Sequence, residues 1–345
     1  MVEGTRFWVG ASTLGQLGSA ARGIRSLDVT ADGDVRLGEP VDVGPNPMYL
    51  AWGDGTLAIV HELADGLVST WSVDGDEVRP LAAGAATGGA DPCHVAFDTS
   101  GALVLTANYS GSRVTVHRVV PGPDGTASLV AAVDLAGTGP NPARQEASHP
   151  HQVVVDQARD RLLVPDLGAD RIRVLRVEVD AGGGAALVHD EASDLRGRPG
   201  AGPRHLVIDG DRAIVANELD RTVSVFDLTT GAELGANAIG APVASDLGAS
   251  AIRLTRGGTV LIGDRALDAV QALRLHSDGR LEHLATLPTG GRHPRDLQLT
   301  HDERHLLVAD QQSDSIAVVA LDDGGVPVAV VATVTTPAPG CLARV

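Results

Sequence analysis

The chain has 345 residues, of which 43% are hydrophobic, so it is long enough to bury a large core. All 27 basic residues are arginines, which excludes chemistry that needs a lysine, such as Schiff-base formation. The formal net charge of −17 argues against binding to nucleic acid or to an anionic membrane surface, although a small anion could still bind where arginines gather.

The ends and the cysteines bear on the cellular compartment. The first residues, MVEGTRFWVG, lack the basic and apolar regions of a secretory signal. No run approaches the roughly 18 apolar residues of a membrane-spanning helix. The two cysteines, Cys93 and Cys341, are too few for a disulfide scaffold or a cysteine metal site. We therefore expect a cytoplasmic protein with two reduced thiols.

A seven-residue motif recurs along the chain, and its proline position returns every 45 to 58 residues. The copies are NPMYLAW from Asn46, DPCHVAF from Asp91, HPHQVVV from His149, GPRHLVI from Gly202, GASAIRL from Gly248, HPRDLQL from His293 and APGCLAR from Ala338. In GASAIRL the proline is replaced by Ala249. A repeat of this period is typical of a propeller or a solenoid.

Each of the first six copies is followed by a second apolar run that ends in small polar residues, and then by a third run, as in LLVPDL and RIRVLRV. Alternating apolar residues, β-branched side chains and Gly, Asp or Asn turns predict strands. With a fourth, more polar run, each period predicts a four-stranded blade. The sequence therefore predicts an all-β fold, a single seven-bladed β-propeller over residues 1–345.

The two ends of the chain are predicted to share one blade. RFWVGA, near the N-terminus, resembles a second strand with no proline-led strand before it. PGCLARV, at the C-terminus, resembles a first strand with nothing after it. Pairing of these two segments would close the ring and remove exposed sheet edges.

The repeat also predicts where polar side chains meet. In an antiparallel hairpin the start of the first strand lies beside the end of the second. Both positions should open onto one mouth of the central channel, whereas the residues three and five places after each proline are nearly all apolar and should pack between blades. The two longest intervals carry inserts before His149 and Arg204, and Arg144, Arg196 and Arg198 on these inserts could help to hold an anion.

Many of these polar residues have a structural alternative. Asx side chains commonly satisfy turn amides, which would account for Asn108, Asp166, Asn217, Asp264 and Asp310 at the strand ends, and we expect the same for Asp170, Asp220, Asp268 and Asp314 in the hairpin turns. His94 and His205 could each bond a backbone carbonyl. Glu218 is the predicted partner of Arg204, and a structural salt bridge would explain that pair as well as catalysis does.

Four stretches carry a family resemblance: PCHVAFDTSGALVLTANYSGSRVTVHRV, SHPHQVVVDQARDRLLVPDLGADRIRV, GPRHLVIDGDRAIVANELDRTVSVFDL and HPRDLQLTHDERHLLVADQQSDSIAVV. Together they resemble the seven-bladed propeller lactonases, the family of the 6-phosphogluconolactonases and the fungal carboxy-muconate cyclases. The resemblance implies a channel-mouth site without an obligatory metal, with His151, Arg204, Glu218 and Arg295 as its catalytic residues. GASAIRL departs from the family pattern.

Four hypotheses about the function remain open from the sequence. The leading hypothesis is hydrolysis of a sugar-acid or related anionic lactone, in which His151 or Glu218 takes a proton from water and Arg204 and Arg295 hold negative charge. The expected substrate contacts are His149, His94, Asn108, His205, Asn217 and Asp166, and no cofactor is expected.

The alternatives are cyclisation of an unsaturated dicarboxylate, a propeller that only binds a metabolite or a protein, and, more weakly, a calcium-dependent gluconolactonase. No GxSxG, Walker A, HExxH or zinc-type motif is present in the sequence. The sequence leaves open the substrate, the identity of the base and the oligomeric state.

Overall fold

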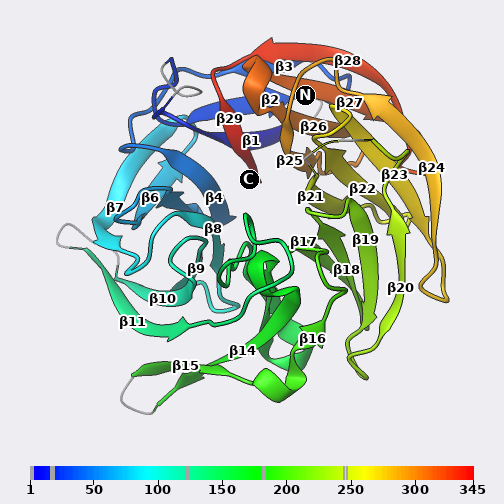
Figure 1. The fold of residues 1–345 in the computed structure, drawn as a ribbon. Helices are drawn as coiled ribbons and strands as arrows, with labels where there is room; N and C mark the ends of the chain where they lie inside the picture. Colours follow the sequence, from blue (N-terminus) through cyan, green and yellow to red (C-terminus); the bar gives the residue numbers. More distant parts are fainter. Residues whose placement is uncertain (1–3, 16–19, 121–124, 181–183, 244, 246–247) are drawn as a thin grey trace.

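The computed structural model describes residues 4–15, 20–120, 125–180, 184–243, 245 and 248–345. Within these residues the strands form seven blades that radiate outward from a central channel (Figure 1). The only other regular elements in the same residues are 3-10 turns: η1 (Gln157–Arg159), η2 (Leu167–Ala169), η3 (Glu191–Ser193) and η4 (Gln311–Ser313). No helix in the described part of the chain is long and apolar enough to cross a membrane.

The first four blades follow the predicted repeat. Blade 1 contains β29 (Pro339–Arg344), β1 (Thr5–Ala11), β2 (Arg25–Val29) and β3 (Val35–Leu37). Blade 2 contains β4 (Pro47–Gly53), β5 (Thr56–His61), β6 (Leu67–Asp74) and β7 (Glu77–Ala86). Blade 3 contains β8 (Pro92–Phe97), β9 (Leu103–Asn108), β10 (Arg113–Val120) and β11 (Thr126–Asp134). Blade 4 contains β12 (Val154–Asp156), β13 (Arg161–Asp166), β14 (Arg171–Val179), β15 (Ala185–His189) and the short β16 (Leu195–Arg196).

The remaining three blades are regular. Blade 5 contains β17 (Pro203–Asp209), β18 (Arg212–Asn217), β19 (Thr222–Asp227) and β20 (Glu233–Ala238). Blade 6 contains β21 (Ala249–Leu254), β22 (Thr259–Asp264), β23 (Ala269–Leu275) and β24 (Leu281–Pro288). Blade 7 contains β25 (Pro294–Leu299), β26 (His305–Asp310), β27 (Ser315–Leu321) and β28 (Pro327–Thr335). One parallel bridge, Ala83 to Thr126, joins the outer strands of blades 2 and 3 into a continuous sheet.

The chain closes the ring by pairing its two ends, as the sequence predicted. β29 lies antiparallel to β1, with Val9 opposite Leu342 and Trp8 opposite Ala343. Both strands lie beside the channel in Figure 1, although they come from opposite ends of the sequence. The inner strand of blade 1 is therefore supplied by the last residues of the chain, and its second strand by the first residues described.

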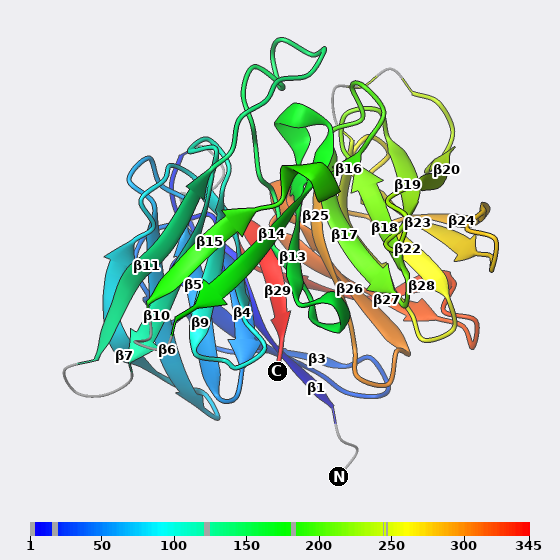
Figure 2. The same ribbon diagram turned by 90° about the horizontal axis from the view of Figure 1, so that it is seen from below.

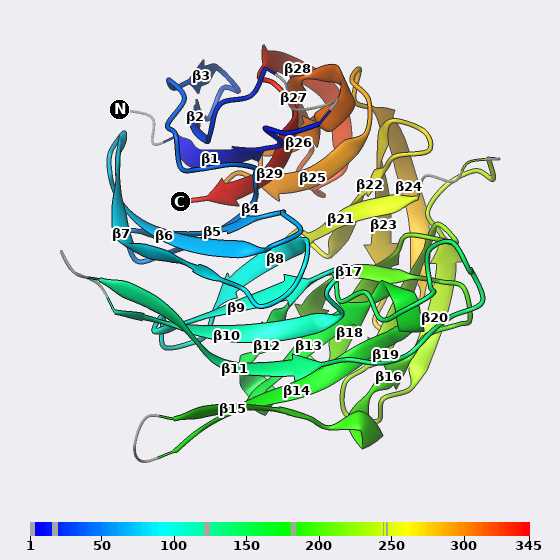
Figure 3. The same cartoon turned by 60° about the vertical axis from the view of Figure 1, so that its left-hand side comes forward.

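Apolar residues three and five places after each proline pack between neighbouring blades, which confirms that prediction. Val153 lies in one buried cluster with Leu105 of β9 and Val164 of β13. Ile252 lies in another with Ile214 of β18 and Ile262 of β22. Figure 3 shows these blades stacked face to face. Because each blade face is covered by the next blade, the apolar side chains are removed from water without a separate core layer.

Aspartates in the hairpin turns hold the start of the next blade. Oδ1 of Asp170, Asp268 and Asp314 accepts the backbone N–H of Gly202, His293 and Ala338 at 2.7 to 2.8 Å. These three acceptors bind the residue that precedes the proline position, which has positive φ in each case. The structural role expected for these three turn aspartates is confirmed, whereas Asp220 instead pairs with Arg198.

The ring closure predicts a specific loss of stability. Replacing Leu342, which is buried against β1, by alanine should lower the free energy of unfolding by about 2–5 kcal/mol, because it leaves a cavity in the closing blade. Denaturant unfolding would measure the change. Val331→Ala, on the exposed side of β28, is the matched control and should change the free energy by less than about 0.5 kcal/mol. Equal effects for both variants would contradict the importance of this closure.

Candidate active site at the channel mouth

A β-bulge lies near the start of the inner strand in blades 2, 3, 5 and 7. In blade 5 the register shifts by one residue between Pro203 and His205, so that Arg204 is the extra, unpaired residue. Blades 2, 3 and 7 show the same shift after their prolines, around Met48, Cys93 and Arg295. A bulge bends the strand and turns the extra side chain away from the ladder. Three of these side chains, those of Cys93, Arg204 and Arg295, line the cavity at the channel mouth.

A second ring of residues follows the second strand of each blade. The residue after the strand donates its backbone N–H to the carbonyl of the residue before the proline position, as Glu218 does to Gly202 at 2.7 Å. Its equivalents are Glu62, Tyr109, Leu167, Arg265 and Gln311, together with Ser12 of blade 1. These hydrogen bonds extend each ladder by one residue and hold this second ring beside the bulges.

The two rings enclose a cavity of about 360 Å³, which confirms that both strand positions meet at one mouth. The cavity is lined by the bulge residues Cys93, Arg204 and Arg295, by His151, which lies just before β12, by the second-ring residues Glu62, Tyr109, Glu218 and Arg265, and by Asp91, Ser110 and Arg144. All four residues predicted to be catalytic are therefore brought together. They come from blades 4, 5 and 7, whose inner ends meet around the channel because the ring is closed.

Glu218 is the centre of charge in this cavity. One oxygen, Oε2, lies 3.0 Å from Arg204 Nε and 2.8 Å from Arg265 Nη2. The other, Oε1, lies 2.6 Å from Arg144 Nη2. Burial alone would raise the pKa of Glu218, but the Arg265 and Arg204 guanidiniums outweigh it and hold the pKa far below its ordinary range. The carboxylate is therefore ionised, and the predicted Arg204–Glu218 pair is confirmed.

Arg204 is almost fully buried, and Nη1 of its guanidinium has no hydrogen-bond partner among the described residues. Burial, with Arg265 next in importance, lowers its pKa to about 10, so that it stays charged at neutral pH. The pKa of His151 is well below 6.5 because the ring is buried and lies close to the positive charge of Arg204. His151 is therefore a neutral imidazole beside a charged guanidinium whose Nη1 lacks an acceptor.

His151 also has close neighbours on its own side of the cavity. Sγ of Cys93 lies 3.7 Å from His151 Nδ1, and burial raises the pKa of this thiol, so it stays protonated. Tyr109 meets the His151 ring edge to face at 5.4 Å. His149 stacks flat on Tyr109 at 4.3 Å and bonds Glu146, so it supports the wall of the cavity without lining it.

Two further predicted residues lie along the channel rather than at the cavity surface. His205 meets the rings of His151, His94 and Tyr49 at centroid distances of 5.4, 5.9 and 6.2 Å. Neither ring nitrogen of His205 has a hydrogen-bond partner among the described residues. Nδ1 of His94 accepts the Val153 N–H at 3.4 Å. Contact of His94 and His205 with a substrate stays a prediction.

The predicted Asx residues bond the protein itself. Asn108 Nδ2 donates to Thr106 and to the Arg113 carbonyl. Asn217 Nδ2 donates to Thr222 and Ser224. Neither side chain lines the cavity, and neither does Asp166. The geometry favours the structural alternative for these three residues, and their contact with a substrate stays a prediction.

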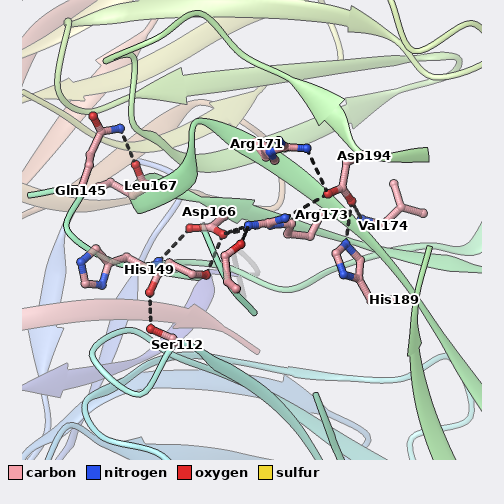
Figure 4. Close-up of polar contacts among 12 residues, drawn as sticks. Ser112, Gln145, His149, Asp166, Leu167, Arg171, Arg173, Val174, His189 and Asp194 are labelled. Carbon is pink, nitrogen blue, oxygen red and sulfur yellow. Dashed lines mark hydrogen bonds and ion pairs between the residues drawn. The ribbon is translucent and has the colours of Figure 1, made fainter. Parts of the chain in front are cut away.

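Asp166 belongs to a buried network that holds both inserts (Figure 4). Its oxygens accept the His149 N–H, the Ser148 hydroxyl and Arg173 Nε at 2.7 to 2.9 Å. Arg173 also donates to Asp194, which receives His189 Nε2 at 2.9 Å. This network fixes the end of the first insert and the start of the second. Figure 2 shows the loop after β11 and the segment before β17 rising on the same face of the disc, as predicted.

Sequence reasoning did not include Glu62, Tyr109 and Arg265 among the candidate site residues, although all three line the cavity. The signal was present, because each is the residue that directly follows the second strand, as Glu218 is. Asn108 and Asn217 stand one position earlier and point away from the cavity. Neighbouring residues on a strand face opposite sides, so only one of each pair could line it.

No three His, Cys, Asp or Glu side chains are grouped so that they could hold a metal ion in the part of the chain that the structure describes. Of the arginines on the inserts, only Arg144 lines the cavity. Arg198 lies 3.0 Å from Asp220 instead.

Comparison with known proteins agrees with this architecture. The model of the family described as "Lactonase, 7-bladed beta-propeller" matches residues 6–344, almost the whole chain. The chain belongs to this lactonase family. Its cavity of arginines, a histidine and a glutamate is thus set in a lactonase propeller.

Individual relatives with names of lactonases are 25 to 28% identical to the chain in sequence. A 6-phosphogluconolactonase of Yersinia pestis is 25% identical over 297 residues, which cover 82% of this chain and 80% of the relative. A 6-phosphogluconolactonase of Formosa agariphila is 28% identical over 68% of each chain. The solved structure of a periplasmic gluconolactonase from Pseudomonas aeruginosa is 26% identical, with a TM-score of 0.89 and 99% of both chains covered. Because that relative is periplasmic, the cytoplasmic location of this chain stays a prediction.

The Glu218 carboxylate is shared by three arginines, which predicts that the stability of a variant without this charge depends on added anions. Glu218→Gln should lower the free energy of unfolding by about 3–5 kcal/mol, because it leaves buried guanidiniums without a counter-charge. Denaturant unfolding with and without inorganic phosphate would measure this, and phosphate should stabilise the variant by binding the folded state. Glu77→Gln, in an exposed pair with Arg79, is the control and should change little. A Glu218→Gln variant as stable as the original chain would contradict the charge analysis.

The buried histidines predict weaker stability in acid. Burial, followed by the nearby arginines, lowers the pKa of His151 and His205 well below 6.5 and that of His94 to about 3. Below about pH 6.5 the unfolded chain therefore binds protons that the folded chain does not, so the free energy of unfolding falls as pH falls. Each histidine should contribute about 1.4 kcal/mol per pH unit.

His205→Leu should remove one of these contributions, because leucine binds no proton in either state. The slope of unfolding free energy against pH, measured between about pH 5 and 6, should become shallower by that amount. An unchanged slope would show that His205 is protonated in the folded protein.

Proposed function

We propose that this protein hydrolyses a sugar-acid or related anionic lactone at the channel mouth. The observation that carries the proposal is the buried Arg204 guanidinium, which has an unpartnered Nη1 beside the neutral imidazole of His151. A charged donor without an acceptor, in a cavity large enough for a sugar, suits an oxygen that becomes negative during reaction. Membership of the lactonase family and the names of the relatives support the same reaction class.

His151 is the better candidate for the base. A general base must be unprotonated at the working pH, and the depressed pKa of His151 keeps its ring neutral. Glu218 is also unprotonated, but three guanidiniums contact its two oxygens, so neither oxygen is free to accept a proton from water. In this mechanism Glu218 positions Arg204 and compensates part of the buried positive charge.

The steps follow from these roles. His151 takes a proton from water as the water oxygen bonds to the lactone carbonyl carbon. The carbonyl oxygen becomes negative and receives hydrogen bonds from Arg204 and Arg295. The ring C–O bond then breaks, and the leaving oxygen takes the proton back from the imidazolium. The product is the open hydroxy acid, and His151 is neutral again.

A panel of sugar-acid lactones and unsaturated dicarboxylates tests the proposal. We expect turnover of lactones with no loss in the presence of a metal chelator. Formation of a lactone from a muconate, with no lactone hydrolysis, would favour the cyclase, which the same arginines could serve by clamping two carboxylates. Binding without turnover of either class would favour a purely binding propeller, and loss of activity in chelator would favour a calcium-dependent enzyme.

Substitution of the proposed base gives a sharper test. His151→Ala should lower kcat by about 10²- to 10⁴-fold, because it removes general base catalysis. His276→Ala, which removes an outer histidine paired with Glu282, is the control and should leave kcat unchanged. Activity of His151→Ala close to that of the unmodified chain would exclude His151 as the base.

A further inference from the structure

Cys93 lines the cavity and contacts His151, but the proposed reaction gives it no part. It stands one place after the proline of blade 3, and His151 stands one place after the proline of blade 4, so the two residues occupy corresponding positions in neighbouring blades. Both are buried, with 6% and 8% of their surface exposed. A buried side chain that touches the proposed base can decide which ring nitrogen of that base carries the proton.

A general base needs more than a neutral ring. A neutral imidazole carries a proton on one nitrogen and a lone pair on the other, and only the lone pair can take a proton from water. Nδ1 of His151 contacts Sγ of Cys93 at 3.7 Å. Nε2 has no hydrogen-bond partner among the described residues and is not one of the fully buried atoms, so it is open to the cavity. His151 can therefore act as the base only if its proton lies on Nδ1.

The direction of the contact between Cys93 and His151 follows from two backbone carbonyls. Sγ lies 3.5 Å from the His151 carbonyl oxygen and 3.7 Å from that of Pro150. A carbonyl oxygen can only accept, so the thiol S–H is the donor in these contacts. Burial raises the pKa of Cys93, so the S–H is kept at neutral pH. With the S–H directed at a carbonyl, the sulfur offers its lone pairs to Nδ1, and Nδ1 then carries the proton.

The other close neighbours of His151 hold its ring plane without distinguishing its nitrogens. Tyr109 and His205 each meet the ring in a T-shaped contact, with centroids 5.4 Å away. The charge of Arg204 opposes a second proton on the ring, whichever nitrogen would receive it. Among the described residues, Cys93 is therefore the only side chain that hydrogen-bonds a ring nitrogen of His151.

We infer that Cys93 is a positioning residue for the proposed reaction: its sulfur accepts the Nδ1–H of His151 and so leaves the Nε2 lone pair facing the cavity. This rests on the proposed function. During the reaction Nε2 takes the proton from water, while Nδ1 keeps its own proton and continues to donate it to the sulfur. When the leaving oxygen takes the Nε2 proton back, the original tautomer is restored. Cys93 forms no bond to the substrate and is neither oxidised nor ionised.

The tautomer of His151 can be measured without any substrate. NMR of protein that contains isotope-labelled histidine distinguishes a ring nitrogen with a proton from one with a lone pair, and comparison with His151→Ala assigns the signals of His151. We expect the Nδ1–H form in the original chain at neutral pH. Cys93→Ala should shift the ring toward the Nε2–H form, because the acceptor of Nδ1–H is lost. Cys93→Ser, which keeps an acceptor, should retain the Nδ1–H form.

The second cysteine of the chain supplies a matched control. Cys341 is also a buried thiol on an inner strand, but its sulfur accepts the Leu50 N–H at 3.2 Å and does not contact His151. Cys341→Ala should therefore leave the tautomer of His151 and kcat unchanged. With a hydrolysed lactone, Cys93→Ala should lower kcat about two- to tenfold with little change in KM, which is the factor that one hydrogen bond is worth.

These measurements separate this inference from the proposed function. If no lactone is hydrolysed, but the Nδ1–H form is found in the original chain and is lost in Cys93→Ala, the proposed function fails and control of the tautomer by Cys93 stands. If lactone is hydrolysed but the original chain has the Nε2–H form, the role assigned to Cys93 is wrong. It is also wrong if Cys93→Ala leaves the tautomer unchanged. The spectrum of the original chain tests the direction of the hydrogen bond even if Cys93→Ala does not fold.

Discussion

Closure of the ring between β29 and β1 is the constraint on which the rest of the structure depends. A propeller blade is covered on both faces only when its neighbours are in place, so an open ring would expose two apolar blade faces and two rows of inner-strand side chains. Leu342 and Val9 join residues from opposite ends of the chain within one buried cluster. Closure also fixes the distance across the channel, so that residues at or just before the inner strands of blades 3, 4, 5 and 7 line one cavity.

Within the closed ring, the buried carboxylate of Glu218 orients the arginines of the cavity. Without it, Arg204 and Arg265 would be charges in a desolvated site with no counter-ion. With it, each arginine is oriented, while the total charge around the carboxylate stays positive. This arrangement favours binding of an anion. It also leaves His151 neutral, because the ring is buried and an added proton would lie close to the charge of Arg204. The same charge pattern thus supports anion binding and general base chemistry.

Much of the architecture could be predicted from the repeat, because the alternation of strands and the spacing of prolines depend only on local sequence. The seven blades, the shared terminal blade and the convergence of His151, Arg204, Glu218 and Arg295 at one mouth all followed from it. It was harder to predict which of the two residues at the end of each second strand faces the cavity. Asn108 and Tyr109 are neighbours in sequence, but only Tyr109 lines the cavity, because the ladder continues one residue beyond the assigned strand.

The sequence by itself determined the strands, their order around the ring and the residue types that reach the channel mouth. The Arg204–Glu218 pair was also predicted, whereas only the tertiary structure decided that Arg144 and Arg265 contact the same carboxylate. Arg144 and Glu218 are 74 residues apart, and their ion pair exists because a buried network in blade 4 holds the insert over blade 5. Local patterns carry no information about such a contact, since it depends on how a non-repeating loop packs against a closed ring. For the same reason the sequence indicated that Arg144, Arg196 and Arg198 could help to hold an anion, but only the folded chain shows that Arg144 is the one that lines the cavity.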